Sequence, residues 1–249
     1  MKFFLDQQRY IDTNQPLDIS MGLSNTPENP RAWYVDQPSF EPVRTEHYTG
    51  SVAEGGSVNF RDIYFNPHGH GTHTECLGHI TQEVYSINEK LNEYFFEAQV
   101  ISLKPETRNN GEEEDRVITL EQMQAIEIHK EALILRTLPN GMEKNTFNYS
   151  DTNPAYLEKE IASYLISQGV KHFLLDLPSV DRESDEGQLA FHHEFWEVPE
   201  NPNHERTITE LIFVPDTIAD GEYILNLQVA PFENDASPSR PVLYEIQSK

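Results

Sequence analysis

The chain has 249 residues, of which 37% are hydrophobic and 24% are charged, a composition typical of a globular protein with a sizeable core. The formal net charge of −24 opposes contact with nucleic-acid phosphates and anionic membrane surfaces, so we expect neither as a partner. No segment approaches the roughly 20 apolar residues of a membrane span, and the start of the chain lacks the apolar core of a signal peptide. The single cysteine, Cys76, cannot form an internal disulfide and fits a reducing compartment, so a cytoplasmic location is expected.

The first quarter of the chain predicts short strands joined by polar turns, at 3–10, 17–20, 41–48 and 57–65. A proline-rich loop at 25–34 ends in two aromatic residues, Trp33 and Tyr34. Aromatic side chains on loops often form pocket walls, so both are candidate substrate-binding residues. The alternative is that they only anchor the loop to the core.

Four histidines and a glutamate are concentrated in the stretch 66–79, which directly follows a predicted strand. Neutral imidazoles and carboxylates are ligands that suit zinc, manganese or iron, and the glycines between them let backbone and ligands crowd one point. The stretch therefore predicts a hydrolytic metal centre. A thiolate nucleophile at Cys76 is the rival reading, but a lone cysteine within a metal-type spacing favours a packing role.

The middle of the chain predicts a βαβ unit. A strand is expected at 95–103, an acidic solvent-exposed turn at 109–115, a short helix at 120–126 after Thr119, and an apolar strand at 132–135. The clearest helix, 154–168, has Asn153 as its N-cap, Pro154 at its first position and Gly169 as its stop. A buried strand at 170–177 follows, so the two strands are predicted to be parallel with Asp176 at a carboxyl end, the edge where α/β folds place ligands.

The last third of the chain contains further candidate ligands. An acidic loop at 178–187 leads to His192 and His193, and Glu210 lies in the apolar run 207–213, where a carboxylate is predicted to be buried and paired with a cation. Strands are expected at 222–229 and 241–246, with a loop at 231–238 between them. Because no repeat or flexible linker is present, we predict one α/β domain, 1–249, with mixed β-sheets and flanking helices.

The stretch Gly71-Thr72-His73-Thr74-Glu75-Cys76-Leu77-Gly78-His79 resembles the H-x-G-T-H-x-D-x-P-x-H pattern of the cyclase-like metal hydrolases. This family includes bacterial kynurenine formamidase and isatin hydrolase. The resemblance continues in matching order through most of the chain, at Leu17–Ser20, Pro178–Asp181, His192–His193, Glu210 and Asp235–Val242. It implies the swivelling β/β/α architecture of that family.

The resemblance also implies roles for individual residues. His73 and Glu75 would bind a divalent metal, zinc or manganese, His79 would donate and accept the proton, and His192 with Glu210 would complete a site for one or two ions. Glu75 stands where the family has aspartate, and Leu77 stands where it has proline. The interval between His192 and Glu210 is longer than in the family, so His193 and His204 are alternatives to His192.

The largest departure is Gly69, which occupies the position of the first histidine. In an extended segment His73 shares a face with Gly69, whereas His68 and His70 point the other way. A bulge at the flanking glycines would bring one of them to the metal. We predict that His68 is this ligand, with His70 as the alternative.

The function implied by the resemblance is hydrolysis of a C–N bond in a small cyclic or acyl amide, such as an arylformamide or a lactam. Metal-bound hydroxide would attack the carbonyl, and His79 would protonate the leaving nitrogen. The alternatives are a lactone hydrolase, or a non-catalytic member of the same fold that binds a metal or a small ligand. The resemblance further suggests a homodimer or higher homo-oligomer with pocket walls supplied across the interface.

Overall fold

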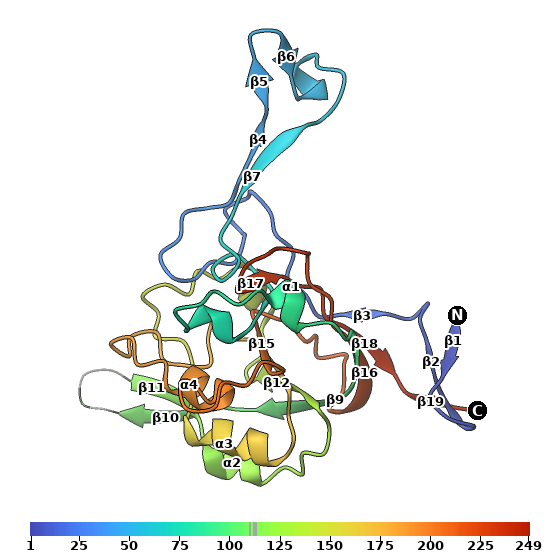
Figure 1. Ribbon diagram of the computed structural model, residues 1–249, viewed down its shortest axis with the longest axis vertical. Helices are drawn as coiled ribbons and strands as arrows, with labels where there is room; N and C mark the ends of the chain where they lie inside the picture. The colour runs from blue at the N-terminus through green and yellow to red at the C-terminus, as the bar shows by residue number, and fades with distance from the viewer. Residues whose placement is uncertain (110, 112–113) are drawn as a thin grey trace.

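A mixed β-sheet of nine strands forms the centre of the molecule within the residues that the structure describes, 1–109, 111 and 114–249 of a computed structural model (Figure 1). The predicted α/β class with mixed β-sheets and flanking helices is confirmed. In spatial order the strands are β17 (Ala236–Pro238), β8 (His73–Glu75), β15 (Thr207–Glu210), β14 (His172–Leu175), β12 (Ala132–Thr137), β9 (Phe95–Leu103), β16 (Gly221–Asn226), β18 (Val242–Glu245) and β3 (Leu17–Asp18).

The middle of this sheet is parallel and fully buried. Strands β9, β12, β14 and β15 are parallel neighbours, with Ala132 opposite both Ala98 and His172. Every residue of β12 and β14 is buried, as expected for parallel strands with both faces covered. The predicted parallel pair is therefore confirmed.

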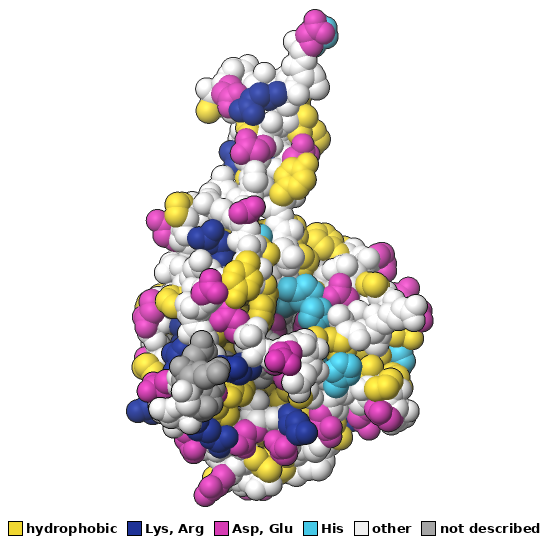
Figure 2. Space-filling view, turned by 90° about the vertical axis from the view of Figure 1, so that its left-hand side faces the viewer, with side chains coloured by type: hydrophobic (Ala, Val, Ile, Leu, Met, Phe, Trp, Pro, Cys, Tyr) yellow, Lys and Arg dark blue, Asp and Glu magenta, His cyan; other side chains and the backbone are white. Residues whose placement is uncertain are grey.

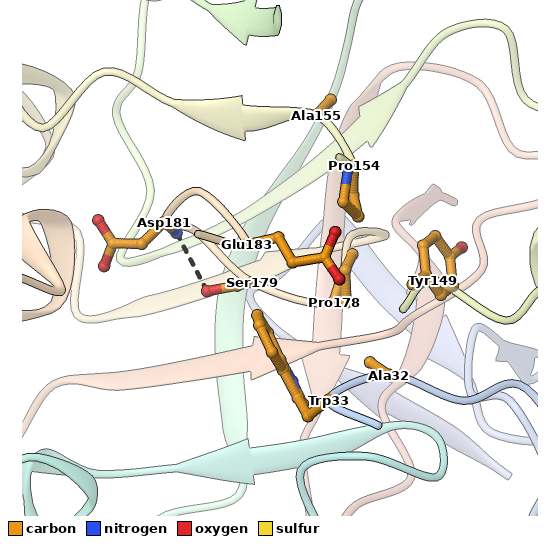
Figure 3. A pocket seen from close by; sticks show the side chains of 9 residues that line it. All are labelled: Ala32, Trp33, Tyr149, Pro154, Ala155, Pro178, Ser179, Asp181 and Glu183. Atoms are coloured by element: carbon orange, nitrogen blue, oxygen red, sulfur yellow. Dashed lines mark hydrogen bonds between the residues drawn. The ribbon is translucent and has the colours of Figure 1, made fainter. Parts of the chain in front are cut away.

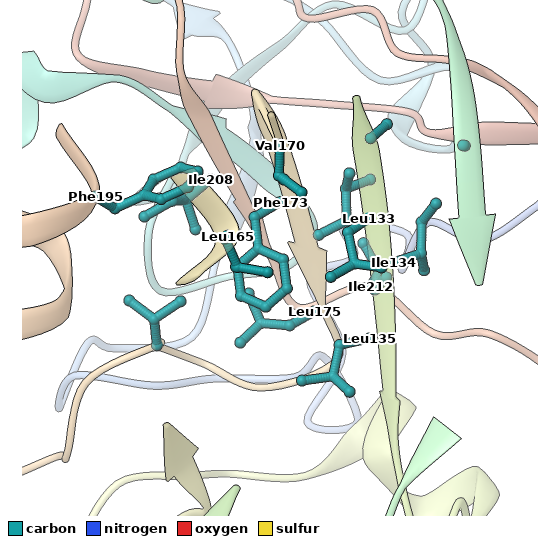
Figure 4. Close-up of a cluster of buried hydrophobic side chains, with 14 of the residues drawn as sticks. Leu133, Ile134, Leu135, Leu165, Val170, Phe173, Leu175, Phe195, Ile208 and Ile212 are labelled. Atoms are coloured by element: carbon teal, nitrogen blue, oxygen red, sulfur yellow. The ribbon is translucent and has the colours of Figure 1, made fainter. Parts of the chain in front are cut away.

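Three short helices lie together on one side of the sheet: α2 (Leu120–Gln124), α3 (Glu160–Ser167) and α4 (Ala190–Trp196) (Figure 1). Figure 4 shows Leu165 of α3 and Phe195 of α4 beside Phe173 of β14 in the main hydrophobic core. The other helical segments are α1 (Ile87–Lys90) and the 3-10 turns Val52–Glu54, Leu77–His79 and Met142–Thr146. No described helix combines the length and the apolar character needed to cross a lipid bilayer.

The predicted helix 154–168 is wrong in its first half. Asn153 has a φ of 43° and is not an N-cap, and the chain then forms β13 (Tyr156–Leu157), which pairs in parallel with β11 (Glu114–Ile118). The N–H of Leu157 donates to the carbonyl of Val180 rather than to a helical partner. Pairing with a neighbouring strand thus overrides local helix propensity. Gly169, with a φ of 79°, ends α3 as predicted.

Other predicted elements differ mainly in their ends. Strand β9 is confirmed at its predicted bounds, and α2 follows its N-cap Thr119, which forms a capping box with Gln122. The predicted acidic turn 109–115 is shorter, because Asn109 ends β10 (Glu106–Asn109) and Asp115 is buried in β11; residues 110, 112 and 113 lie outside the described residues. The predicted loop 231–238 ends in a strand, β17.

The predicted strand 3–10 is two strands, β1 (Lys2–Phe4) and β2 (Arg9–Asp12), separated by a turn. The carboxylate of Asp6 accepts the backbone N–H groups of Gln8 and Arg9 and so stabilises this turn. The carboxyl-terminal strand β19 (Gln247–Ser248) pairs with β2, which brings the two ends of the chain together (Figure 1).

Residues 39–64 form an arm that projects from the body (Figure 1). It contains β4 (Ser39–Pro42) paired with β7 (Arg61–Tyr64), and β5 (Arg44–Thr45) paired with β6 (Tyr48–Thr49), so the predicted strands 41–48 and 57–65 are interrupted. A two-stranded ribbon alone is marginally stable in water. Nevertheless the arm exposes several large apolar side chains: Val52, Val58, Phe60, Ile63 and Tyr64.

The buried imidazole of His172 makes stability depend on pH. Burial lowers the pKa of His172 to about 4, against an ordinary value of 6.5. The unfolded chain therefore binds the proton more readily between pH 6.5 and pH 4, so stability is complete above this window and decreases as the pH falls through it. The loss is at most about 3 kcal/mol. We expect His172→Asn, which can keep the contact with Thr207, to show a smaller decrease in melting temperature from pH 7 to pH 5 than wild type.

The comparison between the two proteins isolates this residue from other groups that titrate in the same range. Equal pH dependence in wild type and His172→Asn would contradict the assignment.

Candidate metal centre

Two adjacent antiparallel strands provide the first three side chains of the site. His73 and Glu75 share one face of β8, because side chains two residues apart in a strand point the same way. Glu210 of β15 is the register partner of His73, so its carboxylate lies on that same face. All three side chains are buried.

Three further histidines reach this point from segments outside the two strands. His68 comes from the turn before β8, His79 from the 3-10 turn after it, and His192 from α4. The closest approaches to Glu75 are 3.1 Å from His68 Nδ1 to Oε2, 3.9 Å from His79 Nε2 to Oε2 and 3.0 Å from His192 Nε2 to Oε1. Glu210 is 3.4 Å from His73 Nε2 and 3.8 Å from His192 Nε2.

These side chains form two groups that could each hold a metal ion, and Glu75 belongs to both. In one group His68, Glu75 and His79 offer ligand atoms within 4.8 Å of one another, and in the other His73, Glu75 and Glu210 do so. Imidazole nitrogens combined with carboxylate oxygens suit first-row divalent ions such as zinc and manganese.

Two buried atoms in the centre of the cluster have no hydrogen-bond partner: His73 Nε2 and Glu75 Oε2. His73 Nδ1 lies 3.0 Å from the carbonyl of Gly71 and must donate to it, so the neutral ring carries its lone pair on Nε2. That lone pair faces the Glu210 carboxylate. The approach of His68 to Glu75 Oε2 likewise lacks hydrogen-bond geometry. Since buried polar atoms are almost always satisfied, this arrangement of facing acceptors fits a bound cation.

His192 is held by a second carboxylate, Asp181. Its Nδ1 lies 2.6 Å from Asp181 Oδ2, and the same carboxylate accepts the backbone N–H groups of Phe191 and His192 at the start of α4. Nδ1 therefore donates to Asp181 and Nε2 faces Glu75, the arrangement in which a carboxylate orients a metal-binding histidine. Burial opposes protonation, but Asp181 and Glu75 outweigh it and raise the pKa of His192 well above its ordinary value.

Asp235 joins the two more exposed histidines. Its Oδ2 lies 2.8 Å from His68 Nε2 and 3.3 Å from His79 Nδ1, and the two imidazole rings stack with centroids 4.2 Å apart. Although burial acts in the opposite direction, Asp235 and Glu75 raise the pKa of His68 to about 10. The pairing of β17 with β8 brings Asp235 here, since Ala236 is opposite Glu75.

Asp235 and Asp181 were not predicted as site residues. Both lie in segments that resemble the family, but no pattern in the sequence indicates which side chain in those segments faces a histidine. Two features are consistent with their place in the site: Asp181 follows the buried strand β14, and Asp235 precedes β17, which pairs with β8.

We expect Asp235→Asn to lower kcat by about 10- to 100-fold while reducing metal content less, because the change affects the orientation of two histidines and removes no ligand. Kinetics and metal content measured on the same preparation test this. Asp62→Asn, at an exposed position of the arm, is the matched control. Unchanged kcat in Asp235→Asn would exclude an orienting role.

The structure brings His68, and not His70, into the cluster. His68 lies in a turn rather than the predicted bulge, where the Asn66 side chain accepts the N–H groups of His68 and Gly69. Glycine is needed at 69 because a Cβ there would come within 2.7 Å of Val35. Both ring nitrogens of His70 are engaged elsewhere, by the N–H of Asn66 and the carbonyl of Asp36.

The remaining alternatives also lie outside the cluster. His193 contacts the carbonyl of Val198, and the ring of His204 packs against Tyr85. Burial raises the pKa of the Cys76 thiol to about 11, which opposes the thiolate alternative. The roles assigned to His68, His73, Glu75, His79, His192 and Glu210 stay predictions, although the structure places all six side chains together.

A cavity of about 370 Å³ opens over the cluster. Figure 2 shows histidine side chains gathered in a hollow of the surface beneath the arm. His68, His79, His192 and Trp33 line the cavity, and the size is typical of small-molecule sites. Tyr34 is not among the described residues that line it: its side chain is 66% exposed and its hydroxyl contacts Asp151. The structure thus separates the predicted aromatic pair.

The model of the putative cyclase family matches residues 17–182. A kynurenine formamidase from Bacillus cereus is 30% identical over 238 residues, which cover 95% of this chain and 100% of that relative.

Two solved structures have a similar fold. One, described as a potential metal-dependent hydrolase with cyclase activity, has a TM-score of 0.64 at 15% identity and covers 92% of this chain and 97% of its own. The other, an isatin hydrolase bound to the product analogue thioisatinate, has a TM-score of 0.59 at 11% identity, with coverage of 94% and 93%. At these identities the likeness concerns the fold alone, and it agrees with the predicted fold class.

Proposed function

The chain belongs to the cyclase family, and we therefore propose that it is a metal-dependent hydrolase that cleaves a C–N bond in a small cyclic or acyl amide. A kynurenine formamidase aligns with this chain over its full length. The observation that carries the proposal is a cluster of four imidazoles and two glutamate carboxylates in which two buried atoms, His73 Nε2 and Glu75 Oε2, lack a hydrogen-bond partner.

We propose that His68, His73, Glu75, His192 and Glu210 hold one or two divalent ions, zinc or manganese. The ion, when bound, would lower the pKa of water to about 7 and polarise a carbonyl. The carboxylates of Glu75 and Glu210 offset its charge in the buried site, and Asp181 fixes the ring of His192.

His79 is proposed as the general acid and base. Its Nδ1 faces Asp235 at 3.3 Å, so Nδ1–H donates to that carboxylate and Nε2 is left to accept and return a proton. The side chain is 31% exposed and lines the cavity, so Nε2 can reach a substrate there. The leaving nitrogen of an amide needs a proton at this step, which makes a histidine of this kind necessary for turnover.

An aromatic amide fits the cavity better than a charged one. Trp33 provides a flat apolar wall, and its φ of 60° places a large side chain in a backbone conformation that few non-glycine residues adopt. Three carboxylates, Glu183, Asp185 and Glu210, line the cavity against one cation, Arg182, and this excess of negative charge disfavours an anionic substrate. We therefore propose an arylformamide or an aromatic lactam as the substrate class.

A screen with metal-loaded protein tests the function. Protein reconstituted with zinc or manganese is assayed with N-formylaniline, isatin and an aryl lactone, and metal content is measured on the same sample. We expect hydrolysis of at least one of the two amides. Turnover of the lactone alone would identify a lactone hydrolase, and bound metal without any turnover would identify the non-catalytic alternative.

We also propose that residues 1–249 form one domain that assembles as a homodimer or higher homo-oligomer. The exposed apolar side chains of the arm support this, because a projecting ribbon gains stability only when another surface covers it. We expect light scattering to give a mass of at least two chains for wild type and a lower mass for F60S/I63S. V84S/M142S, at exposed positions of the body, is the control. A wild-type mass of one chain would refute this assembly. The cytoplasmic location stays a prediction.

A further inference from the structure

A second cavity, of about 380 Å³, lies at the carboxyl ends of the parallel strands β9, β12 and β14. Lys104 directly follows β9, Thr137 ends β12, and Asp176 directly follows β14, as predicted for this edge. No described residue lines both this cavity and the one over the histidine cluster. Open α/β sheets commonly bind ligands at this edge.

The lining of this second cavity carries more cations than carboxylates, unlike the chain as a whole. Three cations, Lys104, Arg116 and Lys144, exceed two carboxylates, Glu143 and Asp176, whereas the whole chain has 18 lysines and arginines against 42 acidic residues. In each of the four other cavities described, carboxylates equal or outnumber cations. This cavity therefore favours an anion more than the rest of the surface does.

Lys144 and Asp176 form an ion pair in the lining of the cavity, so their charges offset each other. Asp176 is fully buried and accepts from Lys144 Nζ at 2.7 Å and from the N–H and hydroxyl of Thr137. Lys144 Nζ also donates to the carbonyl of Thr137 at 2.6 Å. The ammonium is thus occupied by protein groups, and an anion in the cavity would have to be bound by Lys104 and Arg116.

Lys104 and Arg116 are both exposed, and neither has a carboxylate within 4.0 Å in the described part of the chain. Arg116 is anchored by one nitrogen, Nη2, which donates to the carbonyl of Asn153 at 3.0 Å. An anchored guanidinium presents its other N–H groups in a fixed direction, a geometry that suits a carboxylate. Phe147 and Tyr149 line the same cavity, with ring centroids 5.0 Å apart.

A thin wall separates this cavity from the one over the histidines. A gap of about 10 Å³ lies between them. Of the residues that line this gap (Figure 3), Trp33 and Glu183 also line the histidine cavity, and Tyr149 and Pro154 also line the second cavity. A space of this size holds about one water molecule. The two cavities are therefore neighbours, but a ring cannot pass between them.

We propose that the second cavity binds a small aromatic carboxylate, with its ring against Phe147 and Tyr149 and its carboxylate on Lys104 and Arg116. The cavity volume fits a single-ring ligand. This inference does not depend on the proposed hydrolase activity, because no residue of the metal centre takes part.

Calorimetric titration of the metal-loaded protein with benzoate tests the site, with benzamide as the neutral ligand of the same shape. We expect benzoate to bind, benzamide to bind at least about tenfold more weakly, and K104Q/R116Q to weaken benzoate by about tenfold or more, since charge-assisted hydrogen bonds are lost. R61Q/K159Q removes the same charge at exposed positions elsewhere and should bind as wild type does. K104R, which keeps the charge at position 104 and leaves the anchored guanidinium of Arg116 in place, should retain most of the affinity.

Several results would overturn the proposal: no benzoate binding to wild type, equal binding of benzamide, or benzoate binding that K104Q/R116Q leaves unchanged. The last would show that the carboxylate binds elsewhere, including at the metal. If K104Q/R116Q does not fold, as judged by its thermal transition, K104Q alone at the exposed lysine must weaken benzoate for the proposal to stand.

Discussion

Glu75→Gln is expected to lose bound metal and to reduce hydrolysis by about a thousandfold or more. The carboxylate of Glu75 is fully buried, belongs to both candidate ligand groups and lies within 4 Å of three histidines. Glutamine has the same shape but no charge, so a divalent ion held by His68, His73 and His192 would have less charge compensation. Loss of a catalytic ion removes several kcal/mol of transition-state stabilisation, which corresponds to that change in rate. Elemental analysis and initial rates on the same sample test the expectation.

Glu28→Gln, at an exposed loop position, is the matched control for this change. It removes one negative charge that belongs to neither candidate ligand group, and it should keep both metal and activity. If Glu75→Gln retained stoichiometric metal, the assignment of Glu75 as a ligand common to both groups would be wrong.

His79→Ala is expected to lower kcat by about 10²- to 10⁴-fold and to leave metal content unchanged. His79 is the most exposed histidine of the cluster, it lines the cavity, and its Nδ1 is directed toward Asp235 rather than toward the buried ligands. Its removal therefore takes away proton transfer and leaves His68, His73 and His192 in place. A binding protein would have no need of an unligated histidine here, so this variant also separates the enzyme from the non-catalytic alternative.

His193→Ala serves as the control, because His193 is adjacent in sequence to His192 but its described side-chain hydrogen bond is to the carbonyl of Val198, away from the cluster. Loss of metal from His79→Ala would instead make His79 a ligand, consistent with its place in the group with His68 and Glu75. In that case the acid and base would have to be another group.

Local elements were predictable where local forces decide them. Strand β9 and the capped helix α2 lie where hydrophobic pattern and capping residues indicate, and Gly169 ends α3 because a positive φ favours glycine. The segment around Leu157 was mispredicted because its apolar side chain satisfies both a helical and an extended pattern. The strand β11, distant in sequence, decides between them.

The candidate site likewise combines features that local sequence patterns predict with features that only long-range contacts decide. The apolar surroundings of Glu210 correctly indicate that its carboxylate is buried, since the hydrophobic character of a strand is encoded over a few residues. The turn that directs His68 into the cluster and His70 away from it depends on Asn66, Asp36 and Val35, whose positions come from other segments. The orientation of Trp33 toward the cavity and of Tyr34 away from it also depends on residues from other segments, such as Asp151, which contacts the Tyr34 hydroxyl.

By itself the sequence determined that the chain carries a metal-type set of histidines and carboxylates on an α/β framework with a buried parallel pair. These features are set by residue chemistry and by periodicities of a few residues. Only the tertiary structure decided that Asp181 and Asp235 hold the histidines, that an arm projects beside the cavity, and that Lys104 and Arg116 meet at a second cavity. The reason is physical: contacts between β17 and β8, or between β11 and β13, depend on strand pairing across long sequence separations, which no local pattern specifies.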